Sequence, residues 1–160
     1  DKLQKPKIPK VDISSLIQKY GLQDGKTVIL NPYANSVENI DISFFENLAF
    51  ALKRRGYQVV TNLSHDRQQA VAGTEGIICS LAEAYYLANY CGYVVGVRSG
   101  FLDFISYADC RIVALFPEGY PFFESYRLSK WGIKEDAREM IVNSNWSESI
   151  CQIMNYMENE

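Results

Sequence analysis

The sequence has a single histidine, His65, and no cysteine pair at metal-binding spacing. Its four cysteines (Cys79, Cys91, Cys110 and Cys151) form neither a CxxC motif nor a Cys/His cluster, so we expect no metal site. No Ser, Cys or Asp arrangement around His65 suggests a catalytic triad, and we interpret it as a surface loop residue. Cysteines scattered through apolar stretches suit a reducing compartment.

Long apolar runs are also missing. No uninterrupted run reaches the ~18 residues of a membrane span, and the N-terminal lysines are not followed by the apolar core of a signal peptide. We therefore expect a cytoplasmic protein without a transmembrane segment. The first residue is Asp1 rather than methionine, which suggests a piece of a longer polypeptide.

An excess of positive charge and the common nucleotide motifs are absent as well. Sixteen basic residues stand against nineteen acidic ones, whereas nucleic-acid-binding domains are typically basic, so we expect no nucleic-acid partner. The sequence contains no GxGxxG after its first strand, no GxxxxGK[ST] and no GxSxG. The usual dinucleotide fingerprint, a P-loop and a hydrolase nucleophile elbow are thereby excluded.

What the sequence does contain is an alternation of apolar strands and amphipathic helices. With 160 residues, 48% of them hydrophobic, the chain is long enough for one domain with a sizeable core. Strands are predicted at 27–31, 57–62, 76–79, 93–97, 111–116 and 140–142. Helices are predicted at 12–21, from 43 to about 56, from 80, from about 99 and from 146. Capping boxes are predicted at Ser43 with Glu46 and at Ser80 with Glu83.

This order predicts an α/β three-layer sandwich, a Rossmann-like fold with a mostly parallel sheet of five or six strands. We assign residues 1–25 to a linker and N-terminal helix, and residues 26–160 to the Rossmann-like domain. In such folds ligands bind at the carboxyl ends of the strands.

The strongest candidate for a binding site follows the strand at 93–97. Arg98 ends that strand, Ser99 can cap the next helix, and Gly100 keeps the backbone approachable. A guanidinium beside free N–H groups favours a diphosphate or carboxylate. The alternative interpretation is structural, with Arg98 paired to Asp103 or Glu83.

Other strand ends give weaker signals. The polar stretch 31–36 offers Asn31, Tyr33 and Asn35 to a ligand, or is an ordinary turn. Glu83 could bind a ribose hydroxyl, although its capping box already gives it a role. The aromatic-rich stretch 118–131 could cover a ligand, with Arg127 or Lys130 on phosphate; otherwise it packs on the sheet edge or a neighbouring domain.

From Lys26 to Pro117, these motifs together resemble the C-terminal, donor-binding half of GT-B glycosyltransferases, in particular the heptosyltransferase-like members of glycosyltransferase family 9. In that family the strand before the Ser-Gly helix ends in Asp-(Ser/Thr)-Gly-x-x-His. Here Ser99 and Gly100 match, while Arg98 replaces the acid and Asp103 the histidine. A family lysine near the phosphates is replaced by Glu38-Asn39.

The resemblance implies a metal-independent glycosyltransferase without a cofactor, whose donor is a nucleotide-diphosphate sugar. It also implies an N-terminal acceptor lobe that carries the general base, so no catalytic residue is named here and this lobe alone is expected to be inactive. The acceptor would be a glycan or lipid-linked glycan of a surface polysaccharide or lipopolysaccharide, met in the cytoplasm or at the inner face of the membrane.

The residues predicted to bind the nucleotide-sugar are Arg98, Ser99, Gly100, Asp103, Asn31, Tyr33, Asn35, Ser80, Leu81 and Glu83. Two alternatives stay open. One is a non-enzymatic α/β interaction module, and the other is a related sugar-nucleotide enzyme such as an epimerase or pyruvyl transferase.

Overall fold

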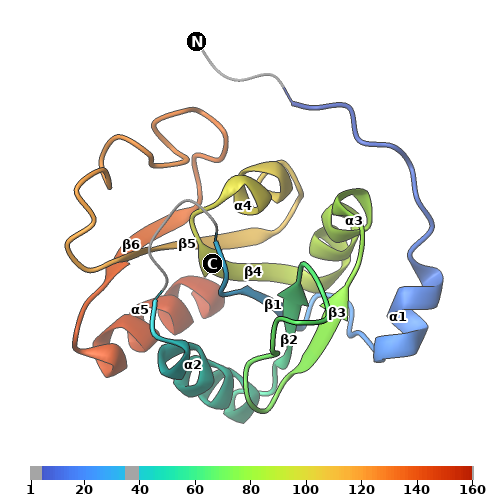
Figure 1. Cartoon of the computed structure of the whole chain (residues 1–160), viewed down its shortest axis with the longest axis horizontal. Coiled ribbons are helices and arrows are strands. Elements are labelled where there is room, and N and C mark those ends of the chain that lie inside the picture. Colours follow the sequence, from blue (N-terminus) through green and yellow to red (C-terminus); the bar gives the residue numbers. More distant parts are fainter. Residues whose placement is uncertain (1–4, 35–39, 160) are drawn as a thin grey trace.

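A computed structural model describes residues 5–34 and 40–159 and contains one six-stranded parallel sheet (Figure 1). The strand order is β3-β2-β1-β4-β5-β6, and every neighbouring pair is parallel. The strands are β1 (Thr27–Asn31), β2 (Gln58–Leu63), β3 (Glu75–Ile78), β4 (Gly92–Val97), β5 (Arg111–Pro117) and β6 (Arg138–Val142). The predicted α/β Rossmann-like class is confirmed, and the sheet is parallel throughout.

Helices cover both faces of the sheet, which explains why the central strands β1, β4 and β5 are buried along most of their length and mainly apolar. They are α1 (Ser14–Tyr20), α2 (Ile42–Arg54), α3 (Leu81–Cys91), α4 (Gly100–Ile105) and α5 (Trp146–Glu158). Helices α2 and α5 bury Phe44, Phe45 and Met154 in one core, while α3 and α4 bury Leu87 and Leu102 in the other.

The chain changes direction across the sheet between β1 and β4. From β1 the connections run outward through β2 to β3, and from β4 they run the other way through β5 to β6. Thr27 pairs in register with both Gln58 and Gly92, so β1 lies at the centre. The carboxyl ends of β1 and β4 are the topological switch point, where doubly wound sheets bind their ligands.

Most helix signals in the sequence are confirmed. Gly21 ends α1 with a left-handed backbone (φ 59°), and Ser80 and Glu83 form the predicted capping box on α3. The predicted box of Ser43 and Glu46 is wrong. Asp41 is the N-cap of α2 and accepts a hydrogen bond from the Ser43 N–H at 2.9 Å, because the helix begins earlier than expected.

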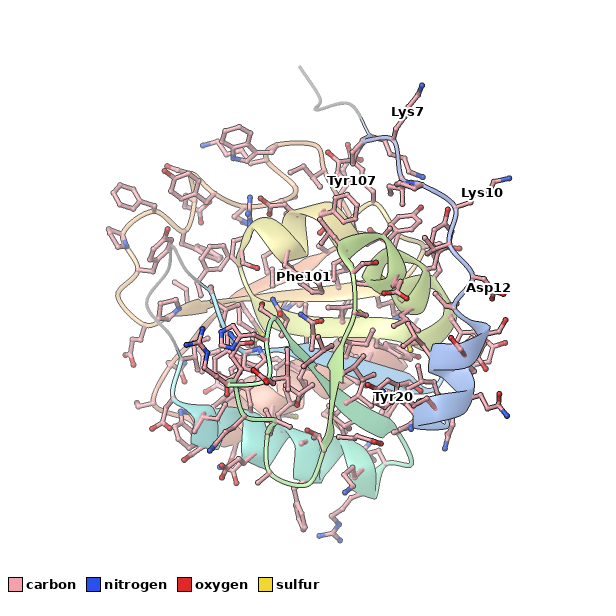
Figure 2. All side chains as sticks on the ribbon, turned by 45° about the vertical axis from the view of Figure 1, so that its right-hand side comes forward. Lys7, Lys10, Asp12, Tyr20, Phe101 and Tyr107 are labelled. Atoms are coloured by element: carbon pink, nitrogen blue, oxygen red, sulfur yellow. The ribbon has the colours of Figure 1, made fainter. Side chains whose placement is uncertain are left out.

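The stretch before α1 lies along the domain. Ile8 and Ile13 pack against the core of the α3 and α4 face, and Lys5 Nζ donates to the Tyr85 hydroxyl at 3.0 Å. Lys7 and Lys10 are exposed and point outward (Figure 2). The outer surface of this segment is therefore basic, and its inner surface is apolar.

Candidate functional site

Three buried polar side chains form a hydrogen-bonded row at the carboxyl edge of the sheet. Asn62 Nδ2, from β2, donates to Asn31 Oδ1 at 3.1 Å, and Asn31 Nδ2, from the end of β1, lies 3.4 Å from Ser99 Oγ. Each is at most 9% exposed. The row joins β2, β1 and the start of α4 across the switch point, and fixes the relative positions of these strand ends.

Gly96 allows this row to form. A Cβ built on Gly96 would lie 2.7 Å from both the Cβ and the backbone oxygen of Asn31, closer than side chains tolerate. Because Gly96 pairs with Asn31 across β1 and β4, the missing side chain lets the Asn31 amide pass beside β4 toward Ser99. The glycine is therefore a packing requirement of the site.

Ser99 caps α4 and leaves two backbone donors at the edge. Its Oγ accepts from the Leu102 N–H at 3.2 Å, and its carbonyl accepts from the Asp103 N–H at 3.0 Å. The N–H groups of Gly100 and Phe101 have no hydrogen-bond acceptor among residues 5–34 and 40–159. Gly100 is exposed, and a Cβ built on it would meet nothing within 4 Å, so this backbone is open to a ligand.

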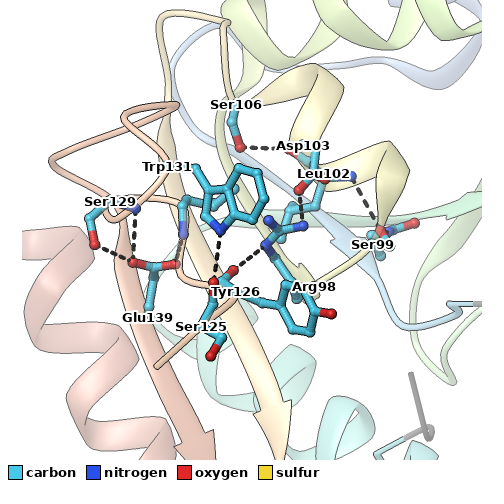
Figure 3. Close-up of polar contacts among 12 residues, drawn as sticks. Arg98, Ser99, Leu102, Asp103, Ser106, Ser125, Tyr126, Ser129, Trp131 and Glu139 are labelled. Atoms are coloured by element: carbon cyan, nitrogen blue, oxygen red, sulfur yellow. Dashed lines mark hydrogen bonds and ion pairs between the residues drawn. The ribbon is translucent and has the colours of Figure 1, made fainter. Parts of the chain in front are cut away.

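Arg98, by contrast, is largely engaged by the protein. Its Nε donates to the Tyr126 carbonyl at 2.9 Å, and Nη1 forms an ion pair with Asp103 (Figure 3). The Arg98 side chain is only 12% exposed. Burial raises the pKa of the Asp103 carboxyl, and the Arg98 charge opposes that rise. Arg98 thus forms the ion pair with Asp103 that the structural interpretation expected, whereas Glu83 accepts a hydrogen bond from Ser80 instead.

Glu139, on β6, is a charged residue that sequence analysis did not single out. Its carboxylate is fully buried and accepts hydrogen bonds from the Leu128 N–H, the Ser129 N–H at 3.3 Å and the Ser129 Oγ at 2.8 Å. Arg127 Nε adds a contact at 3.4 Å. No motif marks this position, because its partners lie in a segment without regular structure.

Three of the predicted residues lie apart from this group. Ser80, Leu81 and Glu83 follow β3, which is three strands from β4 and therefore about 14 Å away at ordinary strand spacing. Glu83 Oε1 accepts from the Ser80 N–H at 2.8 Å, and Leu81 is 46% exposed. They border the same edge of the sheet but do not contact Ser99.

The loop after β1 is described only in part. The Tyr33 hydroxyl donates to the Gln69 carbonyl at 2.6 Å, which ties this loop to the segment after β2. Asn35, and with it Glu38 and Asn39, lies outside the described residues. His65 is exposed, as expected for a loop histidine.

The described part of the chain contains neither a metal-binding cluster nor a membrane-spanning helix. Within 5–34 and 40–159, no group of three or more His, Cys, Asp or Glu side chains is placed to hold a metal ion. None of the helices in this part of the chain has the length and apolar character needed to cross a bilayer.

The strand order defines a doubly wound α/β domain whose switch point lies between β1 and β4, where the candidate site is found. Among solved structures, the chain is similar to a glycosyl transferase family 9 protein from Veillonella parvula, with a TM-score of 0.55 and 18% sequence identity. The likeness covers 88% of this chain but only 42% of the other, so the chain spans less than half of that protein. No protein-family model and no curated protein matches the sequence. The comparison therefore supports the fold.

Proposed function

We propose that this chain is the nucleotide-sugar-binding lobe of a metal-independent glycosyltransferase. The observation that carries the proposal is the pair of N–H groups at Gly100 and Phe101, without acceptors among the described residues, at the switch point of the sheet. The likeness to a glycosyl transferase along 88% of the chain supports it. An anion at a helix start is stabilised by such N–H groups and by the local backbone dipoles.

In this proposal the diphosphate lies against Gly100 and Phe101. Ser99 and Asn31 fix the position of the Gly100 and Phe101 backbone, since both side chains are buried and in hydrogen-bond contact with each other. Arg98 and Asp103 stay beside the phosphates. Because Arg98 already uses Nε and Nη1 within the protein, we assign most direct phosphate contact to the backbone.

The nucleoside end would extend over β1 and β2 toward β3. There Leu81 offers an exposed apolar surface for the base, and the second carboxylate oxygen of Glu83 is assigned to a ribose hydroxyl. Tyr33, and Asn35 by its place in the sequence, would border the middle of the ligand. The proposal assigns these roles to the strand-end positions of the residues.

Chemically, this lobe would stabilise the leaving nucleoside diphosphate by preorganised N–H donors, which act on charge as it develops. The general base would come from a second, acceptor-binding lobe, so this chain by itself would bind donor without turnover. The acceptor is proposed to be a glycan or lipid-linked glycan of a surface polysaccharide, met in the cytoplasm or at the inner face of the membrane.

A second candidate is a non-enzymatic interaction module. The Arg98 ion pair with Asp103 favours it, because the most conspicuous cation at the edge already has an internal partner. In that case the Gly100 and Phe101 N–H groups would be met by water. An epimerase or pyruvyl transferase would share the nucleotide site, but no further observation favours either.

Calorimetric titration with ADP, UDP, GDP, CDP and their common sugar conjugates tests the proposal. We expect one base to bind best and Gly100→Ala to weaken it at least tenfold, because a Cβ would intrude on the phosphate. Ala72→Gly, at an exposed position far from the edge, is the control. If no diphosphate binds, or Gly100→Ala binds as well as wild type, the module is the better account.

A further inference from the structure

Helix α2 carries the most exposed large apolar side chain among the described residues. Phe50 is 64% exposed, whereas Phe44 and Phe45, on the inner side of the same helix, are fully buried. The helix lies at the outside of the domain, beside the loop that joins β2 to β3 (Figure 1). A single exposed ring is common on protein surfaces, so the surroundings of Phe50 decide what its exposure means.

Phe50 borders a shallow hollow that has room for a second aromatic ring. The hollow has a volume of about 550 Å³ and is lined by Glu46, Phe50, Lys53, Arg54, Ala72 and Gly73. Lys53 Nζ donates to the Gly73 carbonyl at 2.8 Å, which fixes the loop wall of the hollow against the helix. A projecting ring therefore lies next to a hollow that can receive a ring of the same kind.

Opposite charges stand on the two sides of Phe50 along the helix. Glu46 lies one turn before Phe50 and Arg54 one turn after it, and all three side chains are exposed. Residues four apart form a continuous ridge on a helix, and we call these three residues the α2 ridge. Among residues 5–34 and 40–159, neither Glu46 nor Arg54 forms an ion pair, and the Arg54 guanidinium lies 5.8 Å from the centroid of the Phe50 ring.

We propose that the α2 ridge is the contact between two copies of this chain. A two-fold axis perpendicular to the helix at Phe50 makes the two helices antiparallel, so a residue one turn before the axis meets a residue one turn after it. Glu46 of each copy then faces Arg54 of the other, which forms two ion pairs on either side of the paired Phe50 rings. Each ring enters the hollow beside the other copy's ring.

Charge favours a second copy over an unrelated partner. Turning the ridge by half a turn about Phe50 places its negative end on its positive end, so the surface is complementary to itself. Lys53, a further cation beside the ridge, already donates to Gly73. The ridge covers little more than two turns of helix, so we expect a weak dimer, with a dissociation constant on the order of 10–100 μM.

The proposed dimer goes beyond the proposed function and does not depend on it. Helices α2 and α5 pack on one face of the sheet, whereas α4, with Gly100 and Phe101 at its start, packs on the other. Contact between two α2 helices therefore leaves the face that carries α4 uncovered in both copies. Donor binding and dimer formation can be measured separately.

Sedimentation velocity over a range of concentrations that brackets this dissociation constant tests the proposal, and we expect the wild type to shift from monomer to dimer. Glu46→Arg and Arg54→Glu should each weaken the dimer at least tenfold, because each change places like charges opposite one another. An equimolar mixture of the two variants should dimerise about as tightly as the wild type, since a mixed pair regains both ion pairs. Circular dichroism confirms that each variant is folded.

Phe50→Ala should also weaken the dimer at least tenfold. Phe122→Ala is the matched control, because Phe122 is 52% exposed on the segment between β5 and β6 and should leave the dimer unchanged. Equal losses in these two variants would show that the ridge is not the specific contact.

The inference is overturned if the wild type stays monomeric, if the charge variants dimerise as the wild type does, or if their mixture fails to restore the dimer. Calorimetric nucleotide titration of Phe50→Ala keeps this inference apart from the proposed function. The donor site predicts unchanged diphosphate binding in that variant, whatever its association state. Loss of both diphosphate binding and dimer formation in Phe50→Ala would contradict the separation of the two surfaces.

Discussion

Arg98 at the end of β4 and Glu139 on β6 hold the same short piece of chain from two sides. Arg98 donates to the carbonyl of Tyr126, and Glu139 accepts from the N–H groups of Leu128 and Ser129. Two largely buried charges of opposite sign thus fix an irregular segment to a rigid sheet. Segment 118–137 is therefore fixed at one side by the residue that follows the carboxyl end of β4 and at the other by a residue near the start of β6.

Glu139→Ala is expected to lower the free energy of unfolding by about 2–4 kcal/mol, because buried N–H groups of Leu128 and Ser129 would lose their acceptor. Urea titration measures the change, and Trp131 fluorescence reports on the segment. Glu124→Gln, an exposed carboxylate on the same segment, is the control and should change stability by no more than about 1 kcal/mol. Equal effects of the two variants would contradict the anchoring role of Glu139.

Alanine substitutions at Gly96 and Gly100, the two glycines at the carboxyl edge of the sheet, should change the stability of the protein by different amounts. Gly96→Ala places a Cβ 2.7 Å from Asn31 and is expected to cost about 1–3 kcal/mol of stability. Gly100→Ala meets no neighbour within 4 Å and should leave stability within about 0.5 kcal/mol of wild type. Thermal unfolding of both variants checks this. A stable Gly96→Ala protein with unchanged Asn31 amide signals would show that the close approach is not needed.

Ser99→Ala removes the cap of α4 and the partner of Asn31 together. The expected loss is about 2–4 kcal/mol, made up of a cap and a buried amide left without its hydrogen bond. Asn145→Ala removes the cap of α5 and an exposed contact with the Glu148 carboxylate, but no buried hydrogen bond, and should cost about 1 kcal/mol. Urea titration compares the two. Matching losses would mean that the Asn31 to Ser99 contact contributes nothing.

Cysteine reactivity should follow burial. Burial raises the pKa of Cys91 and Cys110 to about 12 and that of Cys79 to about 11, whereas Cys151 is exposed. At pH 8 roughly one in ten thousand Cys91 thiols would be ionised, so iodoacetamide should label Cys151 first. Mass spectrometry of the native protein checks the order, and labelling of Cys91 as fast as Cys151 would contradict it.

The same pKa shifts predict how stability depends on pH. Above a pH of about 8.5 the unfolded thiols lose protons while the folded Cys91 and Cys110 keep theirs, so the unfolded state is favoured as pH rises. The free energy of unfolding should be about 1–3 kcal/mol lower at pH 9.5 than at pH 7.5. A protein that is more stable at pH 9.5 would contradict the burial of these thiols.

The fold could be predicted from sequence because its signals are local. Apolar strands such as 27–31 and 93–97, and the capping box of Ser80 with Glu83, are complete within a few residues. The box expected at Ser43 failed because Asp41, two residues earlier, offers a competing carboxylate to the same helix start. Which residue becomes the N-cap depends on the residue at which the helix begins, and the spacing of Ser43 and Glu46 does not determine that residue.

The site was predictable only in part. Ser99 and Gly100 stand in a recognisable strand-to-helix turn, and the Asp103 partner of Arg98 is near in sequence, whereas Tyr126 lies 28 residues from Arg98 and Leu128 lies 11 residues from Glu139. Asn62 gave only the weak signal of a polar residue at a strand end, which also suits an ordinary turn. The hydrogen bond from Asn62 to Asn31 forms because β1 and β2 are parallel neighbours, so that both residues lie at the same edge of the sheet.

The most direct test of the account follows the backbone amides of Gly100 and Phe101 by ¹H–¹⁵N NMR while a nucleoside diphosphate is added. We expect these two signals to shift most, together with that of Ser99, and to saturate at the dissociation constant measured for the nucleotide by calorimetry. If a diphosphate binds while the Gly100 and Phe101 amides stay unchanged, or if none of ADP, UDP, GDP and CDP moves them, the proposed donor site is wrong.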